Sequence, residues 1–156
     1  MLLSANAFWG KSLREKVMAE FIYNRQVQFA ETDMGGIVHF SSFFRFMEEA
    51  EHHFLQSLGL SVVMNLEGKK LGMPRVSAKC DFHHPARFQD SLQIFVKLQR
   101  LGTSSLSYTI DIKKADLLLA TGNIVAVLCE LNDQLPPKSI PIPQNIRDLL
   151  IGGIVG

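Results

Sequence analysis

The chain has 156 residues, of which 47% are hydrophobic and 20% charged, with 16 Lys and Arg against 15 Asp and Glu. At about 150 residues per domain, this length predicts one compact unit. A net charge of +1 leaves no excess of cations for a nucleic-acid backbone. Apolar runs such as Ile124 to Cys129 are far shorter than the roughly 20 residues of a membrane-spanning helix. Composition therefore argues against a nucleic-acid partner and a membrane-spanning helix, and it excludes an acidic or disordered tail.

Cysteine usage and the first residues predict the compartment. Cys80 and Cys129 stand far apart in apolar stretches, without a CxxC pair, and are expected to be reduced core residues. The first ten residues lack the basic start and the long apolar run of an export signal. The sequence therefore predicts a cytoplasmic protein.

The first half of the chain predicts a strand followed by one long helix. Residues 1–19 have a weak helical pattern and are predicted to be an N-terminal extension of a domain formed by residues 20–156. Phe21 to Phe29 partly alternates between apolar and polar residues, which predicts a strand. After a Gly-rich turn, apolar residues recur at helical spacing, with Ser41 or Ser42 as the N-cap and Gly59 at the end. These residues are Phe43, Phe46, Met47, Ala50, Phe54 and Leu58.

The second half is rich in strands. Val76 to Phe82, Leu92 to Leu98 and Leu106 to Ile112 alternate with period two, which predicts an antiparallel meander. The mostly apolar Leu117 to Leu131 predicts an interior strand covered on both faces. Ile146 to Ile151 can form a short final helix. A five-stranded sheet must bury the long helix against one face, and a second copy of the chain is the simplest cover for the other.

The residues from Asp33 to Phe40, DMGGIVHF, carry the strongest chemical signal. They place a carboxylate, two glycines and the start of a helix within eight residues. A carboxylate here can act as a base or nucleophile, and free N–H groups at a helix start can bind an oxyanion. A simpler interpretation remains open at this point, in which Asp33 caps a turn and the glycines only satisfy backbone angles.

The segment from Phe29 to Leu58, FAETDMGGIVHFSSFFRFMEEAEHHFLQSL, resembles acyl-CoA thioesterases of the hotdog fold, in the 4-hydroxybenzoyl-CoA thioesterase-like branch. PARFQD at residues 85–90, the run from Gly102 to Leu106 and the apolar last strand are also similar to that family. The likeness extends from about Phe21 to Pro141. It implies an α+β fold, in which an antiparallel five-stranded sheet wraps around one long central helix.

The resemblance also implies site residues. Asp33 would activate water or attack the thioester carbonyl, and backbone N–H groups near His39 and Phe40 would hold the thioester oxygen. Many relatives have an aromatic residue and then His or Tyr where this chain has His39 and then Phe40, so lining the pocket is an alternative role for His39. No metal or organic cofactor is implied, because coenzyme A is part of the substrate. Substrate contacts are implied for Gly35, Gly36, Ile37, Val38, Phe43, Arg87, Ser104 and Ser105.

Phosphate and metal ligands are less clearly marked. Coenzyme A has three phosphates and needs cations at the pocket mouth, although each candidate can equally be a solvated residue at a strand edge. Glu48 with His52, and Glu49 with His53, have the spacing of metal ligands, but no second long helix is predicted to complete a site. No metal site is therefore expected. The cation candidates are Lys79, Arg87, Lys97, Arg100, Lys113 and Lys114.

Three functional hypotheses follow. The leading one is an acyl-CoA thioesterase; the others are a non-catalytic protein that binds acyl-CoA or an acyl carrier, and an acyl-thioester dehydratase on the same fold. Aromatic residues at the helix start, such as Phe40 and Phe43, can line a pocket for an aromatic acyl group or belong to the core. A homodimer or homotetramer is expected, with a second subunit completing the pocket.

Overall fold

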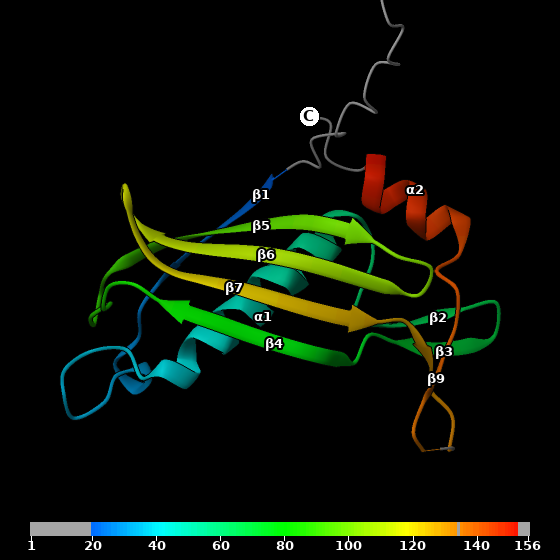
Figure 1. The fold of residues 1–156 in the computed structure, drawn as a ribbon, viewed down its shortest axis with the longest axis horizontal. Coiled ribbons are helices and arrows are strands. Elements are labelled where there is room, and N and C mark those ends of the chain that lie inside the picture. The colour runs from blue at the N-terminus through cyan, green and yellow to red at the C-terminus, as the bar shows by residue number, and fades with distance from the viewer. Residues whose placement is uncertain (1–19, 134, 153–156) are drawn as a thin grey trace, which may run out of the picture.

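Figure 1 shows the computed structural model of the chain, which describes residues 20–133 and 135–152. Five antiparallel strands form the main sheet in the order β1-β5-β6-β7-β4, and the helix α1 (Phe40–Ser57) lies across one face. An antiparallel sheet packed against a helix is therefore confirmed. The strands are β1 (Glu20–Gln26), β4 (Arg75–Phe82), β5 (Ser91–Leu101), β6 (Ser105–Lys114) and β7 (Leu117–Val127).

The strand order differs from the predicted meander. β5, β6 and β7 pair in sequence, but β4 pairs with β7 at the far edge and not with β5. Alternating residues identify a strand and its two faces, but they do not identify its neighbour. β1 and β4 are consequently the two edge strands.

The contact between α1 and the sheet is closest at a glycine. A Cβ atom added to Gly122 of β7 would lie 2.3 Å from Sδ of Met47, so glycine allows the helix to approach the strand closely. Apolar residues of α1 at helical spacing, such as Phe46 and Ala50, are fully buried in the same core. Gly59 follows the helix with φ of +72°, which confirms the predicted end.

The opposite face of the sheet is mostly polar. β6 presents Ser107, Thr109 and Asp111 on this face, and Asn123 of β7 lies opposite Thr109. β7 is an interior strand, as predicted, but within one copy only its inward face is covered, since Asn123 on the other face is exposed. A polar face can remain solvated, so its composition gives no reason to expect a second copy over it.

A second sheet of four strands, in the order β2-β3-β8-β9, and a second helix complete the fold. The predicted single sheet around one central helix is therefore incomplete. Residues 63–72, where no strand is predicted, form the β2–β3 hairpin, whose turn residues Glu67 and Gly68 have φ of 50° and 78°. The predicted helix at residues 146–151 is confirmed. The bounds are β2 (Val63–Leu66), β3 (Lys69–Gly72), β8 (Cys129–Glu130), β9 (Lys138–Ser139) and α2 (Gln144–Gly152).

The two ends of the main sheet carry different structures (Figure 1). At one end, the short 3-10 helix η1 (Phe29–Glu31), the following loop and the start of α1 lie near the end of β4. At the other end lie α2 and the β2–β3 hairpin. Arg147 of α2 donates hydrogen bonds to the carbonyl oxygens of Gly102 and Thr103, which attaches α2 to the β5–β6 turn.

The remaining chain-level predictions have mixed outcomes. Cys80 and Cys129 are free thiols, and burial raises the pKa of Cys80 to about 11, with a smaller effect of Asp81 in the same direction. Neither helix in the described part of the chain has the length and apolar content of a transmembrane span. The predicted extension, residues 1–19, lies outside the described residues.

Candidate active site

Asp33 lies in a tight turn between η1 and α1. An isolated bridge between Thr32 and Val38 closes the turn, and the Asp33 N–H donates to the Ile37 carbonyl at 2.9 Å. One carboxylate oxygen, Oδ1, accepts the Gly35 N–H at 2.8 Å. The turn-capping interpretation therefore describes one oxygen of Asp33, whereas Oδ2 has no hydrogen bond to any described residue.

Gly36 is required by the geometry of this turn. Its φ is +74°, in the left-handed region, and its N–H donates to the Asp33 carbonyl at 3.0 Å. Arg87 Nη1 donates to the Gly36 carbonyl at 3.4 Å, and the Val38 N–H donates to the Ala86 carbonyl at 2.8 Å. The β4–β5 loop therefore supports the turn from the side.

The start of α1 supplies backbone donors next to Asp33. The N-cap is His39, whose Nδ1 accepts the Ser41 N–H at 3.3 Å, so the predicted serine caps are wrong. The His39 N–H is itself engaged, because it donates to the Glu31 carbonyl at 2.9 Å. The Phe40 N–H, at the first position of α1, has no acceptor within the helix and none among the other described residues. Of the two predicted amide donors, only that of Phe40 is therefore free to bind a ligand.

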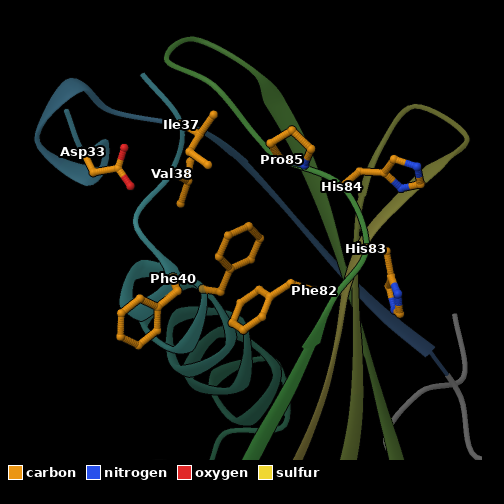
Figure 2. Close-up of a pocket in the computed structure, with 9 residues that line it drawn as sticks. Asp33, Ile37, Val38, Phe40, Phe82, His83, His84 and Pro85 are labelled. Atoms are coloured by element: carbon orange, nitrogen blue, oxygen red, sulfur yellow. The ribbon is translucent and has the colours of Figure 1, made fainter. Parts of the chain in front are cut away.

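Figure 2 shows the pocket beside this turn, with a volume of about 440 Å³. The Asp33 carboxylate is at one side, and the rings of Phe40 and Phe82 lie below it in the view. Phe43 meets Phe82 edge-on, with ring centroids 5.3 Å apart, so α1 and β4 form one aromatic wall. The lining residues are Asp33, Ile37, Val38, Phe40, Phe43, Phe82, His83, His84 and Pro85.

The two histidines after β4 contribute little side-chain chemistry here. Their imidazoles point away from Asp33 in Figure 2, and His84 Nδ1 lies 3.0 Å from the Leu118 carbonyl. They directly follow Phe82, the last residue of β4. The predicted metal-ligand pair Glu48 and His52 has Oε1 and Nε2 3.8 Å apart. In residues 20–133 and 135–152, no cluster of three or more His, Cys, Asp or Glu could hold a metal ion.

The predicted substrate contacts divide into two groups. Gly35, Gly36, Ile37, Val38 and Phe43 all lie in or next to the Asp33 turn and the pocket. Ser104 and Ser105 do not. Ser105 begins β6 and pairs with Val127, at the end of the sheet where α2 lies. The length of β6 separates them from Asp33, roughly 30 Å at 3.3 Å per residue. Within one copy of the chain, Ser104 and Ser105 therefore lie apart from Asp33, and their predicted contact with the substrate stays a prediction.

The predicted cations also do not form one group. Lys97 is paired with Glu20 at 2.6 Å and Lys79 with Asp81 at 3.4 Å. Lys114 pairs with Asp90 at 2.5 Å, in the loop that includes Arg87. Burial opposes the ionisation of Asp90, but hydrogen bonds from Lys114 and the Arg87 N–H outweigh it and lower the pKa of this carboxyl. Arg87 is the predicted cation that contacts the Asp33 turn directly.

Sequence reasoning missed two parts of this region. Phe82 and Pro85 line the pocket from β4 and its following loop. Phe82 is the last residue on the inward face of β4, and that alternation could have identified it. The buried side chain of Arg25, which pairs with Glu31 just before the turn, was also missed, because an arginine is usually solvated.

Comparisons with known proteins identify the scaffold. Residues 35–121 match the Thioesterase superfamily. A 1,4-dihydroxy-2-naphthoyl-CoA hydrolase of Thermosynechococcus vestitus is 32% identical over 124 residues, which cover 78% of this chain and 82% of that protein. The crystal structure of a 1,4-dihydroxy-2-naphthoyl-CoA thioesterase from Synechocystis has 29% identity and a TM-score of 0.74, covering 85% of this chain and 96% of that one. A gentisyl-coenzyme A thioesterase structure has 32% identity and a TM-score of 0.71, covering 81% and 98%.

Proposed function

This chain belongs to the thioesterase superfamily and is a thioester hydrolase, and from that premise we propose that Asp33 is its catalytic carboxylate. The proposed reaction cleaves an acyl-CoA thioester into a free acid and coenzyme A. The observation that carries the proposal is the position of Asp33, whose free oxygen Oδ2 lies beside an aromatic pocket at the start of α1. We assign no metal or organic cofactor to this reaction, and we propose a cytoplasmic location because both cysteines are free thiols.

Asp33 can act by either of two routes. As a general base it takes a proton from water, the hydroxide adds to the thioester carbon, and the C–S bond breaks to release the coenzyme A thiolate. As a nucleophile its oxygen adds to the same carbon, the thiolate leaves, and water hydrolyses the mixed anhydride. A single turnover in ¹⁸O water tests the second route. If water attacks the anhydride at the side-chain carbon of Asp33, one ¹⁸O atom remains in the Asp33 carboxylate.

The Phe40 N–H is the proposed donor to the thioester oxygen. It is the first amide of α1, so the helix dipole adds to the hydrogen bond as negative charge develops on that oxygen. The preceding amide is used by the Glu31 carbonyl and cannot contribute without a rearrangement. This stabilisation is present mainly in the transition state, where it accelerates the reaction.

An aromatic acyl group is the proposed substrate class. The pocket wall consists of Phe40, Phe43 and Phe82, and flat rings pack well against such faces and edges. The relatives described above act on naphthoyl and gentisyl thioesters, which are aromatic. Exposed fractions of 61% for Phe40 and 49% for Phe82 leave room for a ring to be buried there.

The main test combines a variant and a substrate panel. Asp33→Asn removes the base while keeping an acceptor for the Gly35 N–H, so the turn should survive. We expect kcat for benzoyl-CoA, measured by the release of free thiol, to fall at least about a hundredfold, and the melting temperature to stay unchanged. An unaltered kcat would overturn the role of Asp33. A panel of aliphatic and aromatic acyl-CoA esters tests the substrate class.

A homodimer through β4 is the second part of the proposal. β4 is an edge strand with exposed Val76 and Phe82, and it ends at the pocket. Two β4 strands paired antiparallel about a two-fold axis place the Arg75 end of one beside the Phe82 end of the other. Ser105 lies at the Arg75 end of its own sheet, two strands from β4. The second copy's Ser105 would then be about 15 Å from the pocket edge, at three strand spacings.

Mixing two inactive variants tests whether the site is shared. Asp33→Asn removes the carboxylate, and Ser104→Trp blocks the proposed contact from the second copy. If the site spans both copies, a mixed dimer contains one intact site, so an equal mixture should recover about a quarter of wild-type activity. Ser104→Trp with full activity, or a protein that sediments as a monomer, would contradict the shared site.

A further inference from the structure

The side chain of Arg25 in β1 is buried against α1 and η1, the 3-10 helix that precedes the Asp33 turn. This side chain is 6% exposed, and its guanidinium carbon lies 4.0 Å above the ring of Phe46 in α1. Nη2 is paired with Glu31 Oε1, and Nη1 donates to Glu49 Oε2 at 2.7 Å. A desolvated arginine held by two carboxylates and an aromatic ring has little freedom to move. It connects β1, α1 and η1 at one point.

Glu31 connects this arginine to the Asp33 turn. Its Oε2 accepts the Gln28 N–H at 2.8 Å, which fixes the start of η1. Its carbonyl oxygen accepts the His39 N–H at 2.9 Å and the Ser42 hydroxyl at 3.2 Å, which fixes the start of α1. Glu31 is two residues before Asp33 and directly precedes the Thr32 bridge. Its backbone therefore holds His39, the N-cap residue directly before the Phe40 amide, and leads into the turn.

We propose that Arg25 is a positioning residue, which acts through Glu31 to hold the Asp33 carboxylate and the Phe40 N–H at a fixed separation. The proposal rests on the proposed function, since it assumes that these two groups act on one thioester. The reaction needs the carboxylate on the carbon and the amide on the oxygen at the same time. A displacement of about 1 Å between such groups can cost a hundredfold in rate.

The two carboxylates around Arg25 provide a matched pair of variants. Glu31 belongs to the segment that leads into the turn, and its side chain is 11% exposed. Glu49 lies on α1, contacts the same guanidinium, and is 41% exposed. Glu31→Gln and Glu49→Gln each remove one charge partner of Arg25 and keep the size of the side chain. Only the first change loosens the connection to the turn.

The experiment measures kcat and KM against benzoyl-CoA for the full-length wild type and both variants, together with melting temperatures. We expect Glu31→Gln to lower kcat at least about tenfold with KM within about threefold, because binding is retained while alignment is lost. Glu49→Gln should stay within about twofold of the wild type in both constants. Arg25→Met removes the guanidinium itself, so it should lower kcat more than Glu31→Gln does.

Two outcomes would overturn the proposal. Equal losses of kcat in both glutamine variants would mean that Arg25 stabilises the fold without acting through the turn. Unchanged kcat in Glu31→Gln, with a lowered melting temperature, would give Glu31 a purely structural role. The proposed function is tested separately by the wild type and Asp33→Asn, so its failure would appear as absent hydrolysis or as an active Asp33→Asn.

Discussion

Two arginines connect α1 to the two edge strands, and they hold different parts of the molecule. Arg25 of β1 pairs with Glu31 and Glu49 at the end of the sheet where Asp33 lies. Arg75 of β4 pairs with Glu51 at 2.5 Å and with Glu48 at 3.7 Å, deeper along the helix. The first cluster contacts a loop that carries a candidate catalytic group. The second contacts only regular elements and the core.

The second cluster, formed by Arg75, Glu48 and Glu51, includes a carboxylate with one unpaired oxygen atom. Glu51 is fully buried, and its Oε1 has no hydrogen-bond partner among the described residues. Burial raises the pKa of Glu51, and the nearby Arg75 only partly opposes that rise. Burial and the charge of Glu51 likewise raise the pKa of Tyr108. The two ion-pair clusters therefore differ in the element that holds the carboxylate, since Glu31 belongs to η1 before the Asp33 turn and Glu51 lies within α1.

The largest expected effect is on stability, at the second cluster. Arg75→Met leaves Glu51 without its cation in the core, which should lower the free energy of unfolding by about 3 kcal/mol at pH 7. Urea unfolding measures this loss. The kcat of the variant should match the wild type, since no hydrogen bond links Arg75 to the Asp33 turn. A fall in kcat would remove the distinction between the two arginines.

A smaller effect concerns pH. In the folded state the pKa of Glu51 is above its ordinary value of 4.5, so the folded protein binds this proton more readily than the unfolded chain. Its contribution to stability should therefore increase as pH falls from the raised pKa towards 4.5, by at most about 1.4 kcal/mol per pH unit. Glu51→Gln lacks this contribution. Unfolding free energies of both proteins between pH 7 and 4.5 should diverge accordingly, and parallel curves would contradict the raised pKa.

The smallest effect is expected at His39, on the side of the first cluster. Because His39 is the N-cap of α1, His39→Ala should lower the free energy of unfolding by about 1 kcal/mol and leave kcat within about threefold. His39→Asn should restore the stability, because Asn is a good N-cap. Thermal unfolding and thiol-release assays measure the two quantities. A hundredfold loss of kcat in both variants would instead give His39 the chemical role that the family resemblance implies.

The sequence predicted the layers of the fold better than their connections. Period-two and helical spacing identified the long helix and the strands of the main sheet, since burial on one face imposes those periods. The place of β4 beside β7 is a long-range pairing without a local signal. The β2–β3 hairpin has only four residues in each strand around the Glu67–Gly68 turn, too short for a clear period-two pattern, and no strand is predicted there.

In the site, too, residues that are adjacent in sequence could be predicted, and residues that only the fold brings together could not. Asp33, its glycines and the helix start were predicted together because they are adjacent in sequence. Ser104 was placed with them by resemblance, although the sheet separates it from Asp33 within one copy. Arg25 is eight residues before Asp33 and pairs with residues on either side of the turn, so only the folded chain reveals its position.

The close contact between Met47 and Gly122 sets the distance between α1 and β7, and the start of α1 is one side of the pocket. Met47 is seven residues after Phe40, about 10 Å along the helix axis. A larger residue at position 122 would tilt or roll α1 about this point, and the displacement would reach the helix start as a change in the gap between Phe40 and β4. If the pocket binds the acyl group as proposed, a larger side chain at position 122 should shift the preference between small and large acyl groups, although Gly122 does not line the pocket.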